Sequence, residues 1–238
     1  MGYYGYSKYV SVAEKKAKAI RAIEKLKKKN KDIDPVILEG SALVKTWWGK
    51  SWNHNLESYA DYSNRVSRGR SYVRNNAVLD LRISKGIVSA LVQGSRAKPY
   101  VVKIQIDTLS RDKWDQVTRL CNHRIDSLEQ LIEGKFPKEL SVMFTEKKYG
   151  LFPSPKEIHF SCDCPDWAFV CKHVAATLYG IGARLDVNPM LFFDLRDIDG
   201  QELVKKSMEK KLENMLINAG KKSTREIAAE DVQGIFGL

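Results

Sequence analysis

Residues 161–173 have the sequence SCDCPDWAFVCKH, and this stretch organises our interpretation of the whole chain. It holds three of the four cysteines and one of the four histidines. The spacing is C-x-C, six residues, then C-x-H, and it brings together Cys162, Cys164, Cys171 and His173. Three thiolates and one imidazole are the ligand set of a closed structural zinc site. We therefore expect these four residues to bind Zn²⁺, with no ligand position left open for catalysis.

The local geometry of such a site constrains the chain around it. Residues i and i+2 share a face in extended backbone, so Cys162 and Cys164 should come from a strand end or a tight turn. A helix that begins near Cys171 would place its free N–H groups beside the sulfurs and stabilise the thiolates. Between the ligand pairs, Trp167 and Phe169 are expected to cover the site or to anchor it on the main core. The alternative is three free cysteines and an unrelated histidine.

Composition limits the class of protein. The chain has 238 residues, of which 43% are hydrophobic, enough to build a core. No apolar run reaches the roughly 18 residues of a membrane helix, and the N-terminus lacks the apolar segment of a secretory signal peptide. We expect a soluble, cytoplasmic protein with reduced thiols and no membrane partner. The net charge of +11 favours DNA or RNA as a partner; the alternative is a solvated basic surface.

Residues 11–31 are predicted to form a basic amphipathic helix. Ser11 and Glu14 have the spacing of a capping box, and apolar residues then recur at helical intervals. The remaining positions are dominated by lysine and arginine. This helix could lie along a phosphate backbone, or it could be a solvated helix over a narrow apolar stripe.

Residues 64–75, with the sequence NRVSRGRSYVRN, contain four arginines and no acidic residue. We interpret them as a loop in which Gly69 lets the backbone approach a partner, the arginine forks suit phosphates and Tyr72 offers a stacking face. Together with a basic loop over 94–99 they supply the predicted nucleic-acid-binding residues: Arg65, Arg68, Arg70, Tyr72, Arg74, Arg96 and Lys98. The alternative is a surface loop whose arginines pair with scattered carboxylates.

Hydrophobic periodicity predicts an α+β fold. Alternation with a period of two predicts an antiparallel meander near 78–106 with one polar face, built from strands over 78–83, 87–93 and 100–106. A further strand over 158–161 should deliver Cys162, and an apolar helix over 174–183 should follow the ligands. The fold expected is therefore a small antiparallel sheet packed with several helices, plus a C-terminal zinc-knuckle strand-loop-helix. The other expected helices cover 51–62, 110–121, 125–132, 137–144 and 203–216.

Shifts in composition suggest four segments along the chain. They are a basic N-terminal arm and helix (1–34), an α+β core (35–150), a zinc-finger region (151–200) and a C-terminal helix and tail (201–238). The apolar run 36–38 is expected to be a short strand. Three tryptophans fall within residues 47–52, and such clusters are more often core or interface anchors than ligand cages.

The ligand spacing resembles the SWIM zinc finger of helicase-associated bacterial proteins and Mutator-type transposases. Stretches at 47–52, 68–74, 151–153 and 162–179 also resemble bacterial SWIM zinc finger family proteins, so the resemblance covers most of the chain up to about residue 203. It implies zinc on the four ligands named above and association with a SWI/SNF-type helicase-like ATPase. SWIM fingers are generally proposed to bind DNA or proteins.

Three functions follow as hypotheses. The first is a zinc-stabilised nucleic-acid-binding module that partners a helicase-like ATPase. The second is a protein–protein adaptor without direct nucleic-acid binding, which would use the tryptophan cluster and the apolar C-terminal end. The third is an enzyme such as a metal nuclease built from scattered acids (Asp80, Asp107 and Asp194). We expect no enzyme, because the sequence has no phosphate-binding glycine loop, no H-E-x-x-H and no nucleophile elbow.

Overall fold

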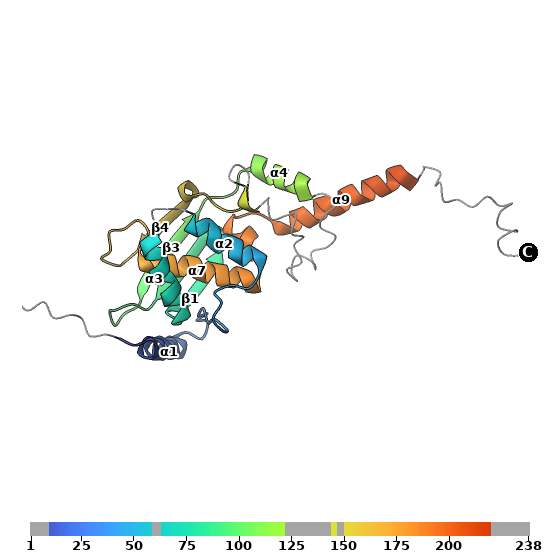
Figure 1. The fold of residues 1–238 in the computed structure, drawn as a ribbon. Coiled ribbons are helices and arrows are strands. Elements are labelled where there is room, and N and C mark those ends of the chain that lie inside the picture. Colours follow the sequence, from blue (N-terminus) through green and yellow to red (C-terminus); the bar gives the residue numbers. More distant parts are fainter. Residues whose placement is uncertain (1–9, 59–62, 122–143, 147–149, 220–238) are drawn as a thin grey trace, which may run out of the picture.

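The computed structural model describes residues 10–58, 63–121, 144–146 and 150–219. Its centre is a four-stranded sheet in which every neighbouring pair is antiparallel, in the order β1-β2-β3-β4. The strands are β1 (Val78–Ser84), β2 (Ile87–Val92), β3 (Tyr100–Ile106) and β4 (Ile158–Cys162). With the helices around it, this sheet confirms the α+β fold (Figure 1).

The sheet forms as the alternating sequence predicts. Side chains of β3 alternate strictly between buried and exposed, so one face meets the main core and the other, with Val101, Lys103 and Gln105, points away from it. Lys85 and Gly86 both adopt positive φ in the tight turn between β1 and β2. β4 then pairs with β3 in the register Ile104↔Phe160, which places the segment that leads to the cysteines inside the same sheet as the meander.

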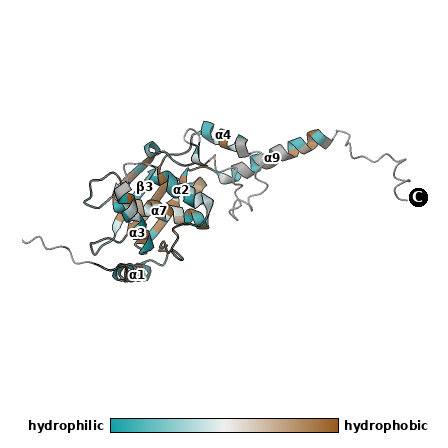
Figure 2. Cartoon of the chain, viewed as in Figure 1, coloured by the Kyte–Doolittle hydropathy of each residue, from teal (hydrophilic) through white to brown (hydrophobic). Residues whose placement is uncertain are grey.

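The helices surround this sheet and are α1 (Val12–Lys29), α2 (Trp47–Glu57), α3 (Ser63–Arg74), α4 (Arg111–Cys121), η3 (Pro155–Glu157), α7 (Lys172–Val187), α8 (Leu191–Leu195) and α9 (Gly200–Ala219). α7 lies against one face of the sheet, with α2 and α3 packed on it (Figure 1). α1 packs on the opposite face, where Ala19 and Ile23 meet Leu79. α9 extends away from the body, and exposed hydrophobic residues occur along its outer half (Figure 2).

α7 is the central helix of the fold. Its residues from His173 to Gly182 are buried, as expected for an apolar helix covered on several sides. The indole N–H groups of Trp48 and Trp52 donate to the carbonyl oxygens of Leu185 and Leu178, at 2.9 and 3.0 Å. The tryptophan cluster therefore anchors the core, as the sequence indicated.

Three local predictions are wrong. Residues 68–74 are not a loop, because α3 extends from Ser63 to Arg74. α2 begins at Trp47 rather than near residue 51, because the Thr46 side chain caps the helix by accepting from the Gly49 N–H. Residues 36–38 form no strand; Val36 donates a single backbone hydrogen bond to β1. The helices expected over 125–132 and 137–144 lie outside the described residues, except for the last position.

Candidate metal centre

The four predicted ligands meet where β4 ends and α7 begins. The sulfur and nitrogen atoms of Cys162, Cys164, Cys171 and His173 all lie within 4.8 Å of one another. Nδ1 of His173 is 3.8 Å from Sγ of Cys162 and 3.9 Å from Sγ of Cys171. In a tetrahedral site with Zn–S bonds of about 2.3 Å, neighbouring ligand atoms lie roughly 3.8 Å apart. The cluster can therefore hold one metal ion.

Each ligand pair is positioned as its spacing predicts. Cys162 is the last residue of β4, and Cys171 is the N-cap of α7. The N–H of Val174 donates to Sγ of Cys171 at 3.5 Å. The Cys162 thiol donates a hydrogen bond to Cys171. This bond lowers the pKa of Cys171, although burial alone would raise it, and it raises the pKa of Cys162. Cys171 is thus the thiol most readily ionised, with the helix N-terminus beside its charge.

The His173 ring is held by aromatic neighbours that the ligand spacing does not predict. The ring of Tyr100 stacks on it with centroids 4.0 Å apart, and Tyr72 meets it edge-on at 5.5 Å. A Cβ atom on Gly94 would clash with Tyr100 and lie 2.9 Å from Nε2 of His173. These contacts fix the imidazole with Nδ1 toward the sulfurs. The sequence gives little indication of these contacts, because Gly94 and Tyr100 are more than 70 residues from His173.

We call residues 165–170 the finger loop. It is tied to the body by two ion pairs that use the predicted nucleic-acid-binding arginines. Arg65 on α3 pairs with Asp166 at 3.0 Å, and Arg96 pairs at 2.5 Å with Asp163, just before the loop. Despite slight desolvation, the hydrogen bond from Arg96 lowers the pKa of Asp163. Both carboxylates therefore hold the backbone and are not metal ligands.

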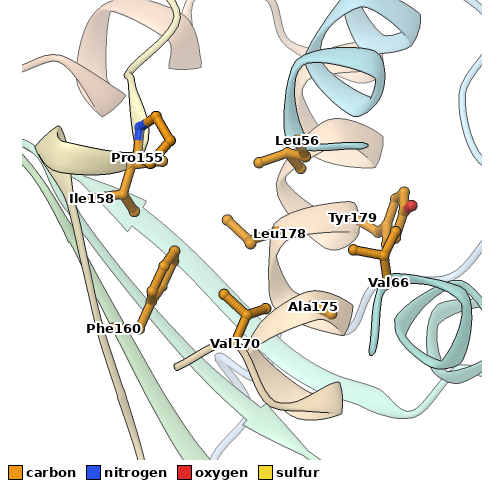
Figure 3. A pocket seen from close by; sticks show the side chains of 9 residues that line it. All are labelled: Leu56, Val66, Pro155, Ile158, Phe160, Val170, Ala175, Leu178 and Tyr179. Carbon is orange, nitrogen blue, oxygen red and sulfur yellow. The ribbon is translucent and has the colours of Figure 1, made fainter. Parts of the chain in front are cut away.

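The finger loop does not cover the metal centre with its aromatic residues. The side chain of Trp167 is 95% exposed and that of Phe169 is 63% exposed, so the expectation that Trp167 covers or anchors the site is wrong. Val170 is the buried anchor instead, beside Phe160 and Leu178 (Figure 3). The apolar cavity that these residues line measures about 10 Å³, which leaves no room for an indole.

The remaining predicted nucleic-acid contacts differ in their surroundings. Arg70 donates to the Tyr179 hydroxyl at 2.8 Å and pairs with Glu57 at 2.6 Å, so it links α3, α7 and α2. Tyr72 is half-buried against His173. Three side chains are exposed and form no ion pair within the described part of the chain: Arg68, Arg74 and Lys98.

Gly69 does not face a partner molecule. A Cβ atom there would lie 2.6 Å from Cβ of Ala175 and 2.8 Å from its carbonyl carbon. The close backbone approach that the sequence suggested is therefore made to α7 of the same chain. It lets α3 lie directly on the helix that carries His173.

The basic helix α1 lies near the metal centre. Nζ of Lys18 donates to the carbonyl oxygens of Gly94 and Ser95, at 3.0 and 3.1 Å. Beneath the helix is a cavity of about 370 Å³, lined by residues that include Lys15, Lys18 and Tyr72. Because Gly94 and Tyr72 also touch His173, the basic helix and the metal centre share neighbours.

Comparisons with known proteins give a relative but no function. The uncharacterized protein Rv2102 of Mycobacterium tuberculosis is 35% identical over 164 residues, which is 68% of this chain. The chain spans 59% of the length of that relative. No family model and no solved structure matches. Among the described helices, none combines the length and the hydropathy that crossing a membrane requires.

Proposed function

We propose that the chain is a zinc-stabilised nucleic-acid-binding module of the SWIM zinc finger type, which partners a helicase-like ATPase. The observation that carries the proposal is the convergence of Cys162, Cys164, Cys171 and His173 within 4.8 Å. Three soft thiolates and one imidazole favour zinc over magnesium or calcium, which prefer oxygen ligands. Four protein ligands complete a tetrahedron, so zinc here supports the fold rather than catalysis.

Positive charge supports the nucleic-acid part of the proposal. Most basic side chains of α1 are exposed, among them Lys16, Lys25 and Lys28. Arg68 and Lys98 add exposed cations outside α1. Cations spread over such a surface bind phosphates through counterion release, which makes affinity strongly dependent on salt.

The ATPase partner is proposed from the resemblance to SWIM zinc finger proteins. One observation also favours the adaptor alternative: α9 exposes Met208, Leu212, Met215 and Leu216, each 57–67% accessible. A row of exposed apolar side chains on a projecting helix suits a protein contact. A protein contact at α9 could also accompany nucleic acid bound at the basic surface, but the adaptor alternative has no direct nucleic-acid binding.

The test is binding of a labelled DNA or RNA oligonucleotide over a series of salt concentrations. Replacing Lys16, Lys25 and Lys28 together by alanine should weaken binding. The slope of the logarithm of the binding constant against the logarithm of the salt concentration should become shallower by about 0.7–0.9 for each phosphate that the protein no longer neutralises. The matched control replaces three exposed lysines outside α1, namely Lys45, Lys50 and Lys156. Binding that does not depend on salt, or an equally weakened control, would contradict the proposal.

The adaptor alternative makes a different prediction. In a pull-down with this chain as bait, an ATPase partner should then stay bound after nuclease treatment. The chain alone should not bind naked nucleic acid. Replacing Met208 and Leu212 by serine should abolish that recovery. If instead nuclease releases the ATPase, nucleic acid bridges the two proteins.

A further inference from the structure

Trp167 differs from the other four tryptophans. Trp48, Trp52 and Trp114 are buried and Trp47 is half-buried, whereas Trp167 is 95% exposed. An indole is mostly apolar with one polar N–H group, and tryptophan is enriched at binding interfaces for this reason. Phe169, two residues along the loop, is also largely exposed at 63%.

The loop that presents Trp167 is held at both ends. The Arg65–Asp166 ion pair fixes the residue before the tryptophan, and Oδ1 of Asp166 accepts from the Ala168 N–H at 3.3 Å. After it, the Phe169 ring packs edge-on against Phe160, with centroids 5.3 Å apart. Val170 is buried. A surface aromatic on a fixed backbone loses little conformational entropy on binding.

The charge around the finger loop is positive. The segments that hold the loop carry five cationic residues: Arg65 and Arg68 on α3, Arg96 and Lys98 before β3, and Lys172 at the start of α7. Arg68 follows Arg65 by three residues on α3, so both side chains lie on the same face of the helix, and Arg68 is exposed. The carbonyl oxygen of Lys98 accepts from Nε of Arg96, which itself pairs with Asp163. The two carboxylates here, Asp163 and Asp166, are each neutralised by an arginine.

A flat aromatic surrounded by cations matches the chemistry of a single-stranded nucleic acid. Every base offers a π-face for stacking, and the backbone offers one phosphate per nucleotide to neighbouring arginine and lysine side chains. Bases inside a duplex are already stacked on each other and cannot reach such a platform. An apolar protein partner would bury Trp167 together with charged neighbours, which costs desolvation.

We propose that the finger loop is a stacking platform for single-stranded nucleic acid, with a base on the Trp167 indole and adjacent phosphates on Arg68 and Lys172. The proposal rests on the nucleic-acid binding proposed above and names where and in which form the strand binds. It assigns the finger loop a contact role that the closed metal centre cannot have by itself.

Fluorescence of the full, zinc-loaded chain tests the proposal. Trp167 is the tryptophan in water, so it dominates the red-shifted and iodide-quenchable part of the emission. Titration with a ten-residue oligothymidylate should quench this part, and Trp167→Phe should remove the quenching. Trp167→Ala should bind the oligonucleotide about tenfold more weakly than the wild type, and the loss of affinity should be smaller for Trp167→Phe. Neither variant should change the affinity for a blunt duplex.

The matched control is Val187→Ala, which removes another exposed apolar side chain, 83% accessible, from the far end of α7. Because Trp167 is so exposed, its variants should keep the zinc content and melting temperature of the wild type. Equal affinity of Trp167→Ala and wild type, or quenching that persists in Trp167→Phe, would overturn the stacking proposal. The stacking proposal would also be overturned if Trp167→Ala lost a protein partner that resists nuclease treatment but still bound the oligonucleotide.

The two proposals fail in different ways. If the wild type binds neither the oligonucleotide nor the duplex at low salt, the proposed function itself is wrong and stacking falls with it. If binding is salt-dependent and weakened by the α1 lysine changes but not by Trp167→Ala, nucleic-acid binding stands and only the platform is overturned.

Discussion

Arg196 is a deeply buried cation, with 1% of its side chain exposed. Its Nη2 donates to Oε1 of Glu157 at 2.7 Å. Oε2 of Glu157 accepts from the N–H and the hydroxyl of Ser154, at 2.9 and 2.8 Å. Burial alone would raise the pKa of Glu157, but these hydrogen bonds outweigh it and lower the pKa to about 2. The carboxylate therefore compensates a charge that has no other ionic partner among the described residues.

This pair predicts how stability depends on pH. The folded pKa of about 2 lies below the ordinary value of 4.5, so the contribution of Glu157 is complete above pH 4.5 and is lost as the pH falls toward 2. At neutral pH, Glu157→Gln should lower the free energy of unfolding by about 3 kcal/mol, because it leaves Arg196 buried without a counterion. Denaturant titrations between pH 2 and 7 measure both effects.

The control for this change is Glu39→Gln, at an exposed carboxylate. Acid also weakens metal binding, but it does so in every variant, so the difference between Glu157→Gln and wild type isolates the ion pairs of Glu157, with Arg196 at 2.7 Å and with Lys113 at 3.4 Å. That difference should shrink as the pH falls from 4.5 toward 2. A constant difference across this range would show that the ion pair has no such role.

At the residue scale, the sequence predicted the metal ligands, whose spacing is local, and missed the side chains around them, whose positions depend on packing. The ligands could be named because chelation requires those residue types at those intervals. The positions of Tyr72 and Tyr100 around His173 depend on contacts between distant segments. Trp167 was placed wrongly for the same reason, since Val170 and Phe160 occupy the space next to the core.

At the scale of elements, the contact between α3 and α7 supports the metal centre. Gly69→Ala would place a methyl group 2.6 Å from Cβ of Ala175. Alanine is normally about 1 kcal/mol better than glycine inside a helix, yet here we expect a loss of about 2 kcal/mol in the free energy of unfolding. Equilibrium unfolding in urea measures it.

The neighbouring change Arg68→Ala gives the control, because this side chain is exposed on the same helix and its removal should alter stability by less than about 0.5 kcal/mol. The sign of the Gly69→Ala effect is decisive. A variant more stable than the wild type would mean that α3 and α7 are not in close contact.

Prediction succeeded for the strands and failed for α3, for physical reasons. β3 alternates strictly and β1 and β2 alternate over part of their length, and the three strands are bounded by turns, so their period is clear in the sequence. α3 is rich in Ser, Asn, Arg and Gly, which gives a weak local preference for helix. Burial of Val66, Gly69 and Val73, at helical spacing, stabilises it against α7. That spacing was present in the sequence but was obscured by the glycine and the arginines.

At the scale of the whole molecule, the segment 151–200 and the core share one structure. β4 is a strand of the central sheet, and α7 packs against β1, α2 and α3. Residues from Val36 to Leu195 contribute to a single hydrophobic core. Metal bound at the β4–α7 junction would therefore stabilise the central sheet and helix together, and its removal should destabilise the body rather than a separate finger.

Zinc-edge X-ray absorption of the purified full chain tests this account most directly. We predict one zinc per chain with three sulfur ligands at about 2.3 Å and one nitrogen at about 2.0 Å. Cys164→Ser should change this shell, whereas Cys121→Ser, in α4, should leave it intact. A chain that retains no zinc, or whose zinc has mainly oxygen ligands, would contradict the central claim that Cys162, Cys164, Cys171 and His173 form a closed structural zinc site.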